Sequence, residues 1–467
     1  MIDPPFAAAG LLVLVASSAP AHEGLFEPPI TPSKYHHHEY EELGYQPAYC
    51  PGASPSFDRQ HRPYLMVNYP FSRGEPPQTT VPGHRGDLMF LRADGWHFAD
   101  LEAVLQAHFG DRGTLAGYSK RVEFIAETDE MFLLVKYARE DGRHELAMIT
   151  SPDHGETFQV HPICPTHDEP YVRMDTEHFA GHNRIGWPML VGVNRRRDEP
   201  KDRGRDYPSY FHYFLLDQVD GKVQSVDTGL LSDMASRSPI GSMYVNTSIV
   251  STRDRIHVVW HDATFEGKPW DDKVYAATYD KRDRRWVNRK TYVGPSKDDH
   301  GFPTVVLDSE QYLHVLCGTH VDVVPYARST RPDATEFPET RPIPGIAKAT
   351  HLSFICDRND RLHLFFRDNT KPSGDRSGLS YARKDKGQPW RKPIRLANSP
   401  QPGYCRMCNH VSLDKRGRLF LNYGYFTLDY RSEGKVAGWY YPVLAYSTDR
   451  ADTWRLVPDD FDLDPGR

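Results

Sequence analysis

Three histidines and one arginine stand at matching places in two consecutive stretches of this sequence. His300 and His320 flank an apolar run, a polar turn and a Leu-His-Val run, and His351 and Arg367 flank a similar pattern with a Leu-His-Leu run. If both stretches are β-hairpins of one scaffold, the residues before the first strand and after the second lie at the same end. Three imidazoles and a guanidinium gathered there could transfer protons on an anionic substrate.

The same pattern recurs along the chain at intervals of about 50 to 60 residues, a period typical of propellers. A charged turn such as Arg358–Arg361 precedes each second apolar run. These runs are Ile256–Val258, Leu313–Val315, Leu362–Leu364 and Leu419–Leu421, with fainter copies at Pro63–Leu65, Met131–Leu133 and Trp187–Leu190. Only Leu101–His108 has a helical pattern. The sequence therefore predicts an all-β fold, a seven-bladed β-propeller with four-stranded antiparallel blades.

Two segments resemble the Asp box of BNR-repeat propellers, S-x-D-x-G-x-T-W/F. Ser151–Phe158 fits this pattern fully, and Ser447–Trp454 fits it except that Ala451 replaces the glycine. In such a turn the Asp carboxylate accepts backbone N–H groups, and the aromatic residue packs between sheets. The resemblance supports a propeller and names no chemistry.

The N-terminal residues indicate a targeting segment. Ala7–Ala16 is an apolar run of small residues, and Ala19-Pro20-Ala21 is similar to a signal-peptide cleavage site. We expect residues 1–21 to be a signal peptide, which makes the protein secreted or periplasmic, and an unstructured apolar N-terminus is the alternative. Residues 22–56 would then be a linker or ring-closing segment, and residues 57–467 the catalytic propeller domain.

Composition narrows the classes of partner. The net charge is −6, and the one basic cluster, Arg195–Arg197, is typical of a solvated loop rather than a nucleic-acid surface. Outside the N-terminal run, no apolar stretch is long enough to span a membrane. We expect a monomer that binds an acidic polysaccharide, without a nucleic-acid or membrane partner.

The segment from 300 to 369 resembles the BNR-type propeller polysaccharide lyases, which include the ulvan lyases and the rhamnose–glucuronate lyases. In these families one blade presents two histidines about twenty residues apart, as His300 and His320 are here, and the next presents a Tyr followed sixteen residues later by an Arg. The resemblance implies that His300 and His320 are the catalytic pair and that Arg367 faces a uronate carboxylate. His351 stands where the family has Tyr, so it departs from the family pattern at the position of the proton donor.

The chemistry that the resemblance implies has a clear physical basis. In β-elimination a 4-O-linked uronate loses its C5 proton and its C4 substituent, and the C5 proton is reactive only when the adjacent carboxylate is neutralised. An arginine can bind that carboxylate bidentately and stabilise the developing enolate charge. A neutral histidine can remove the proton, and a second His or a Tyr can return one to the leaving oxygen. This chemistry requires no cofactor.

Other polar side chains of the same repeats could contact the substrate. We expect this role for Tyr326, Tyr381, Tyr404, His410 and Tyr423. By contrast, the mid-strand residues His257, His314 and His363 are expected to be hydrogen-bonded core residues.

Cysteines offer a possible structural metal site. Cys405, Cys408 and His410 place three potential ligands within six residues, which suits a structural zinc ion, and calcium is a second possibility. The signal lacks a second CxxC, so a disulfide or free thiols remain the alternative.

Two other functions remain open at this point. A propeller glycoside hydrolase, similar to a sialidase or a rhamnosidase, would use carboxylates such as Asp262, Asp299, Asp322 and Asp368. A noncatalytic glycan-binding propeller would use exposed aromatic residues such as Trp260, Trp270 and Trp439.

Overall fold

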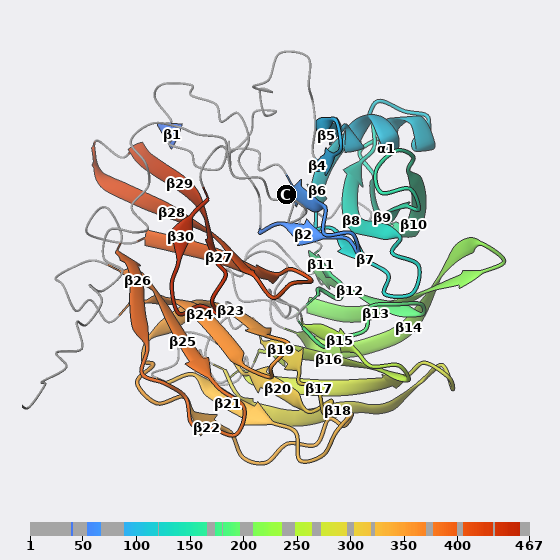
Figure 1. Ribbon diagram of the computed structural model, residues 1–467. Helices are drawn as coiled ribbons and strands as arrows, with labels where there is room; N and C mark the ends of the chain where they lie inside the picture. Colours follow the sequence, from blue (N-terminus) through green and yellow to red (C-terminus); the bar gives the residue numbers. More distant parts are fainter. Residues whose placement is uncertain are drawn as a thin grey trace, which may run out of the picture.

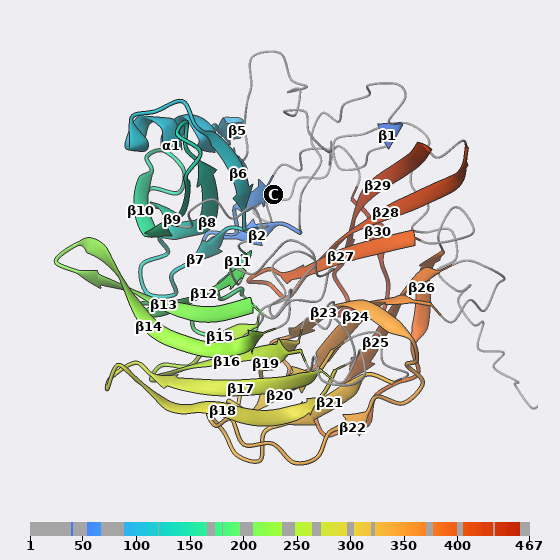
Figure 2. The same ribbon diagram turned by 180° about the vertical axis from the view of Figure 1, so that it is seen from behind.

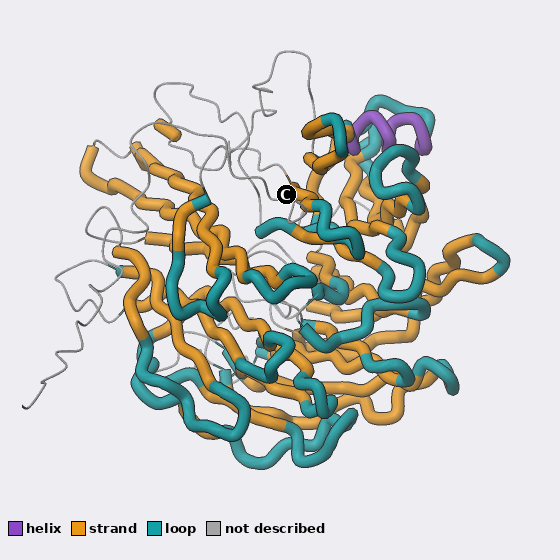
Figure 3. The backbone as a smooth tube through the Cα atoms, in the orientation of Figure 1, coloured by secondary structure: helices purple, strands orange, loops and turns teal. Residues whose placement is uncertain are grey.

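The hairpin repeats fold into antiparallel β-meanders that follow one another around a common centre, as a computed structural model of the protein shows (Figures 1 and 2). The fold is an all-β propeller arrangement with one helix in the described part of the chain (Figure 3). The structure describes residues 39–40, 54–66, 88–119, 121–165, 173–179, 181–196, 209–235, 248–263, 272–296, 303–318, 323–369, 377–398, 405–432 and 435–457.

Sheets I and II come first in the chain. Sheet I consists of β2 (Ser56–Phe57), β3 (Pro63–Met66), β4 (Leu88–Arg92) and β5 (Gly95–Ala99). Sheet II consists of β6 (Thr114–Tyr118), β7 (Glu123–Phe124), β8 (Met131–Ala138), β9 (His144–Ser151) and β10 (Gln159–Pro165). Both β6 and β7 pair with β8, so together they form one interrupted inner strand.

Sheet III has eight strands. They are β11 (Arg173–Asp175), β12 (Met189–Arg196), β13 (Ser209–Val219), β14 (Lys222–Ala235), β15 (Ile249–Ser251), β16 (Arg255–Asp262), β17 (Lys273–Asp280) and β18 (Arg285–Pro295). Its two halves of four strands are joined by a single residue pair, Ala235 with Asp262.

The last three sheets complete the arrangement. Sheet IV consists of β19 (Thr304–Leu307), β20 (Leu313–Leu316), β21 (Pro325–Arg328) and β22 (Arg341–Pro342). Sheet V consists of β23 (Ala349–Cys356), β24 (Leu362–Asp368), β25 (Gly378–Lys384) and β26 (Ile394–Asn398). Sheet VI consists of β27 (Cys405–Leu413), β28 (Leu419–Ser432), β29 (Lys435–Ser447), β30 (Arg455–Leu456) and the N-terminal β1 (Glu39–Tyr40).

The number of sheets corrects the sequence-based prediction. Five sheets of the described chain have four or five strands, the size of a propeller blade, and the sixth has eight. Seven separate blades are therefore not observed. The physical reason is the backbone pairing of β14 with β16, which joins two consecutive four-stranded repeats into one hydrogen-bonded sheet.

The alignment of the repeats is confirmed. Six of the seven apolar runs that the sequence aligned fall on the second strand of a meander, the seventh, Trp187–Leu190, overlaps the start of β12 (Met189–Arg196), and the charged turns lie just before these strands. The second strands are β3, β8, β12, β16, β20, β24 and β28.

Apolar side chains pack between consecutive sheets all the way round. One buried cluster joins sheets I and II, and another joins sheets IV, V and VI. The circle closes where Phe57, Leu65 and Met89 of sheet I pack against Phe420 and Leu444 of sheet VI. Pairing of β1 with β29 adds a strand from the N-terminal part of the chain to the last sheet.

Both Asp boxes have the expected geometry. Asp153 accepts the backbone N–H of Thr157 at 2.8 Å, between β9 and β10, and Asp449 accepts that of Thr453 at 2.8 Å, between β29 and β30. Trp454 is buried between sheets, and Phe158 packs against the cluster of sheets I and II. Ala451, which replaces the glycine, adopts a φ of 66°.

The helix was also expected. It is α1 (Leu101–Phe109), capped by the Asp100 side chain, and it buries Leu101 and Leu105 between sheets I and II. No helix among the described residues is long and apolar enough to cross a membrane. The proposed signal peptide, residues 1–21, lies outside the described residues, as does most of segment 22–56.

Candidate functional site

His351 and Arg367 lie on neighbouring strands at one end of sheet V. In the ladder of β23 and β24, Thr350 is the partner of Arg367. The Arg367 Nε–H donates to the Thr350 Oγ1 at 2.6 Å, and the arginine is 3% exposed. Sequence reasoning missed Thr350, which fixes the orientation of the guanidinium. Any tight contact to an anion would be strong here, because charge interactions strengthen away from water.

The backbone of His351 is unusual. Its φ is 51°, in the left-handed region, at a register shift of the β23–β24 ladder between Thr350 and Ser353. The Asn409 Nδ2 of the neighbouring β27 donates to the His351 carbonyl at 2.8 Å and so supports this conformation. A non-glycine residue in the left-handed region costs on the order of 1 kcal/mol, and such strain is often found at functional sites.

His300 and His320, the other two predicted catalytic residues, lie outside the described part of the chain. The strands that flank them are described. Thr304, at the start of β19, pairs with Leu316, at the end of β20. The segments carrying both histidines therefore leave sheet IV at the same end. The inner strands β19 and β23 also contact each other, so sheets IV and V are neighbours.

The predicted tyrosine contacts receive no support from their positions. The Tyr326 hydroxyl is 2.6 Å from the His314 Nδ1, and the Tyr381 hydroxyl is 2.8 Å from the His363 Nδ1. Burial raises the pKa of both phenols above the usual value. Tyr423 is fully buried. Tyr404 lies outside the described residues.

The mid-strand histidines are confirmed as core residues. His257, His314 and His363 are all buried, and both ring nitrogens of each have a partner. Burial lowers the pKa of His314 and His363. These two imidazoles are therefore neutral near pH 7.

Cys405, Cys408 and His410, the predicted metal ligands, all belong to β27, whose register against β28 runs without a shift. Of the three, His410 has a described side chain, and it is buried.

Two aspartates that a glycoside hydrolase would use, Asp262 and Asp368, are bound by basic side chains. Asp262 accepts from Lys290 at 2.6 Å, and Asp368 accepts from Arg395 at 3.0 Å. Asp299 and Asp322 lie outside the described residues, as does Trp270. Trp260, expected to be exposed, is fully buried and donates to Asp262 at 2.9 Å, so that expectation was wrong.

Sequence reasoning missed the segment 176–188, which we call the crossing loop. It connects the first two strands of sheet III, and it is much longer than the turns at the equivalent places of sheets IV to VI. The unusual length of this segment is the feature of the sequence from which the crossing loop could have been predicted.

The crossing loop contacts four sheets. Ile185 accepts from Ala126 of sheet II, and Arg184 donates to Ser251 of sheet III. His182 lies 3.0 Å from the carbonyl of Asp357 in sheet V. The Lys415 Nζ of sheet VI lies 4.1 Å from the ring centroid of Phe179. These contacts come from around the circle, so the loop crosses its centre on the side of the charged turns.

The crossing loop carries strongly perturbed groups. His178 lies between Glu123 at 3.0 Å and Asp175 at 3.2 Å, and although burial lowers its pKa, these carboxylates raise it to about 9. Burial raises the pKa of Glu177 to about 7, and its Oε1 accepts from the Ser251 hydroxyl.

A small hollow adjoins the loop. Its lining includes Arg121, Glu123, Phe179 and Lys415. Neither His351 nor Arg367 lines it.

Comparison with known proteins gives partial similarities. Residues 270–457, less than half of the chain, match the family model described as a BNR repeat-containing family member. No curated protein matches the sequence.

Solved structures that match parts of the chain include three carbohydrate enzymes. An ulvan lyase described as a new family of polysaccharide lyase shares 16% identity at a TM-score of 0.36, over 48% of this chain and 58% of that one. A Trypanosoma rangeli sialidase shares 12% identity at a TM-score of 0.36, over 76% and 57%. A xylan β-1,4-xylosidase from Bacillus halodurans shares 11% identity at a TM-score of 0.31, over 60% and 55%. The chain thus spans less than two thirds of each of these proteins.

Proposed function

We propose that this protein is a polysaccharide lyase that cleaves a 4-O-linked uronic acid, glucuronate or iduronate, by β-elimination. The substrate class is an ulvan-like or rhamnose–glucuronate glycan. One observation carries the proposal: Arg367 pairs with Thr350 across β23 and β24 and donates to its hydroxyl, and the strained His351 directly follows Thr350. The spacing of His300 and His320 in the preceding repeat completes the proposed group.

Each proposed residue has one task. The guanidinium of Arg367, oriented by its bond to Thr350, binds the uronate carboxylate. His300 or His320 removes the C5 proton, whose electrons form the C4–C5 double bond while the C4–O bond breaks. His351 or the other histidine returns a proton to the leaving oxygen. The reaction is balanced without water, metal or redox cofactor.

Several expectations about the environment of the enzyme belong to this proposal. A polymer substrate lies outside the cell, which fits a secreted or periplasmic protein with a signal peptide at residues 1–21. The partner is an acidic polysaccharide bound by a monomer, at the end of sheets IV and V from which the histidine-bearing segments leave.

We also propose that the ring contains seven four-stranded units. Within sheet III, Leu190, Phe211 and Tyr213 of the first half pack against Ile256 and Trp260 of the second half in one buried cluster. Side chains of two halves pack in this way when the halves face each other as adjacent blades. An experimental structure in which the halves form one open, continuous sheet would contradict this.

Substitution of Arg367 tests the function. Arg367→Ala should lower turnover of uronate polymers roughly 100- to 1000-fold, since the enolate charge loses its stabilising donor. Arg367→Lys should rescue little, because an ammonium group cannot replace the bidentate fork. Arg383→Ala is the matched control, because Arg383 belongs to β25 of the same sheet and its ion pair with Asp452 lies away from the proposed site.

The opposite pattern would replace the lyase with a hydrolase. If Arg367→Ala kept near-normal turnover while Asp262→Asn or Asp368→Asn abolished it, a carboxylate would carry the chemistry.

A further inference from the structure

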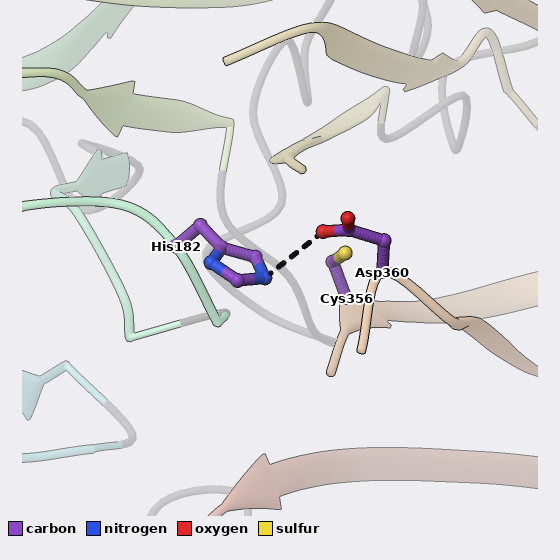
Figure 4. Close-up of side chains that lie close together, drawn as sticks. All are labelled: His182, Cys356 and Asp360. Carbon is purple, nitrogen blue, oxygen red and sulfur yellow. Dashed lines mark ion pairs between the residues drawn. The ribbon is translucent and has the colours of Figure 1, made fainter. Parts of the chain in front are cut away.

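The crossing loop brings one histidine to a cysteine and an aspartate of sheet V. His182 comes from the loop, Cys356 ends β23, and Asp360 belongs to the turn before β24 (Figure 4). One donor atom from each of the three side chains lies within 4.8 Å of the other two. The cysteine is fully buried, Asp360 is nearly so, and the His182 side chain is 21% exposed. The site therefore has an entry path on the histidine side.

The spacing of the donor atoms fits a tetrahedral zinc site. The His182 Nε2 is 3.2 Å from the Asp360 Oδ1 and 3.0 Å from the Asp357 carbonyl oxygen. The Cys356 Sγ is 3.6 Å from that same carbonyl oxygen. In a zinc tetrahedron with ordinary bond lengths, neighbouring N and O ligands lie about 3.3 Å apart and S and O ligands about 3.6 Å apart. These three separations match the tetrahedron to within about 0.3 Å, and the Cys356 Sγ lies within 4.8 Å of the His182 and Asp360 donor atoms.

We propose that His182, Cys356 and Asp360 bind a structural zinc ion, with the Asp357 carbonyl as the fourth ligand. Nitrogen, thiolate and carboxylate donors together are the ligands that zinc prefers over magnesium or calcium. On binding, the thiol proton leaves Cys356, and the His182 proton resides on Nδ1. The ion would tie the crossing loop to sheet V.

Neighbouring groups support a cation at this place. Asp360 is oriented by Ser309, whose N–H and hydroxyl donate at 2.7 and 2.6 Å, and by Lys386 at 2.7 Å. Such surrounding hydrogen bonds fix a carboxylate in the position that a metal requires.

A second cluster in the described chain shows why the first is favoured. Asp58, Asp129 and His154 also place donor atoms within 4.8 Å. That cluster lacks a thiolate, so it offers a zinc ion no soft donor.

The close approach of the loop depends on Gly181. Its φ is 107°, and a Cβ at this position would meet the Cys356 carbonyl oxygen at 1.9 Å. A glycine here lets His182 reach the cysteine and the aspartate of a sheet on the other side of the ring. A zinc ion would stabilise this close backbone contact between Gly181 and Cys356.

Metal content and cobalt spectroscopy of the full chain test the proposal. Wild type, treated with chelator and then exposed to Zn²⁺ and freed of excess, should retain one equivalent, and His182→Gln and Cys356→Ser should retain at least about tenfold less. With Co²⁺ in place of zinc, wild type should show thiolate-to-cobalt charge-transfer absorption. Cys356→Ser should lose this absorption, and Cys317→Ser, which removes another buried cysteine, should keep it.

Each outcome either supports or contradicts the proposed zinc site. Loss of the cobalt absorption and of zinc in the two ligand variants alone supports the site. Retention of zinc by both variants would assign the metal to other residues, such as Cys405 and Cys408, and a wild type that binds no zinc would overturn the proposal. If Cys356→Ser does not fold, His182→Gln still tests the zinc site, because the His182 side chain is partly exposed. A further readout is the melting temperature, which a chelator should lower in wild type but not in His182→Gln.

Discussion

At the scale of single residues, the histidines divide by their place in a strand. In mid-strand residues such as His314, both ring nitrogens are hydrogen-bonded to core partners, here Tyr326 and Asp308. His351, the third residue of β23, differs from them in its left-handed conformation, although it is buried as well. The sequence predicted the burial of the mid-strand histidines, because a residue inside an apolar run must pack between sheets, but it did not predict the burial of His351. It could not predict that Thr350 anchors Arg367, since that bond depends on the register of the two strands.

His351→Asn should separate catalysis from structure. Asparagine tolerates the left-handed conformation well, so stability should change by less than about 1 kcal/mol. The rate on a uronate polymer should fall roughly 100- to 10,000-fold, because the amide cannot transfer a proton. Initial rates and urea denaturation measure the two effects. His314→Asn should do the reverse, losing stability while each folded molecule keeps its rate, and a His351→Asn variant at full rate would remove this histidine from the mechanism.

Glu177→Gln should reveal a titrating core carboxyl. Burial raises its folded-state pKa from 4.5 to about 7, so the folded protein binds this proton more tightly than the unfolded chain. The Glu177 contribution to stability is therefore present below pH 4.5 and is lost as the pH rises through 7. Nearby Lys281, Glu123 and His178 are shared by both proteins, and Ser251 remains available as a partner.

Urea denaturation across pH 4 to 8 measures this effect. Glutamine cannot ionise, so the variant should gain stability relative to wild type across that window, by at most about 3 kcal/mol. A difference in unfolding free energy that stays constant from pH 4 to 8 would contradict the raised pKa.

At the scale of elements, the charged turns follow from local sequence and the crossing loop does not. Asp58, Asp308, Asp357 and Asp414 each accept the backbone N–H four residues later, so the turn forms within its own segment. Such local bonds are predictable from residue type. The crossing loop is held by partners in four different sheets, and contacts of that kind cannot be inferred from one sequence before the fold is known.

Gly181→Ala should displace the crossing loop from its close contact with Cys356. The new methyl group would collide with the Cys356 carbonyl in a backbone conformation that L residues rarely adopt. We expect a loss of at least about 2 kcal/mol in the free energy of unfolding, from strain and steric overlap. Gly142→Ala is the matched control, because Gly142 has a φ of 84° with no atom within 4 Å of the added carbon. Equal effects of the two substitutions would mean that the close approach does not matter.

At the scale of the whole molecule, the period of the apolar runs was enough to predict a propeller. The repeat placed every second strand correctly, because each meander must bury the same positions against its neighbours. The sequence did not predict that two repeats share a sheet. That union rests on a single backbone pair, Ala235 with Asp262, and backbone pairing across repeats leaves no pattern in side chains.

Ser54→Ala should weaken the closure of the ring. The buried Ser54 hydroxyl accepts from Asn422 N–H at 2.9 Å and lies within hydrogen-bond distance of the His410 and Phe420 carbonyls, all in sheet VI. Removing it leaves a buried donor unpaired and should cost about 1 to 3 kcal/mol in denaturation experiments. Ser56→Ala should be nearly neutral, since its buried hydroxyl has no hydrogen-bond partner in the described structure. Similar losses for both serines would deny Ser54 this role.

The product of the reaction tests the central claim most directly. The wild-type protein is incubated with a panel of uronate polysaccharides, and ultraviolet absorbance is followed alongside the release of reducing ends and the product masses. Elimination predicts that absorbance rises in step with new reducing ends, because each cleavage creates a conjugated C4–C5 double bond beside the carboxylate, and that each unsaturated fragment is one water lighter than its hydrolytic counterpart. New reducing ends without absorbance, in fragments that have gained water, would show a hydrolase and contradict the account.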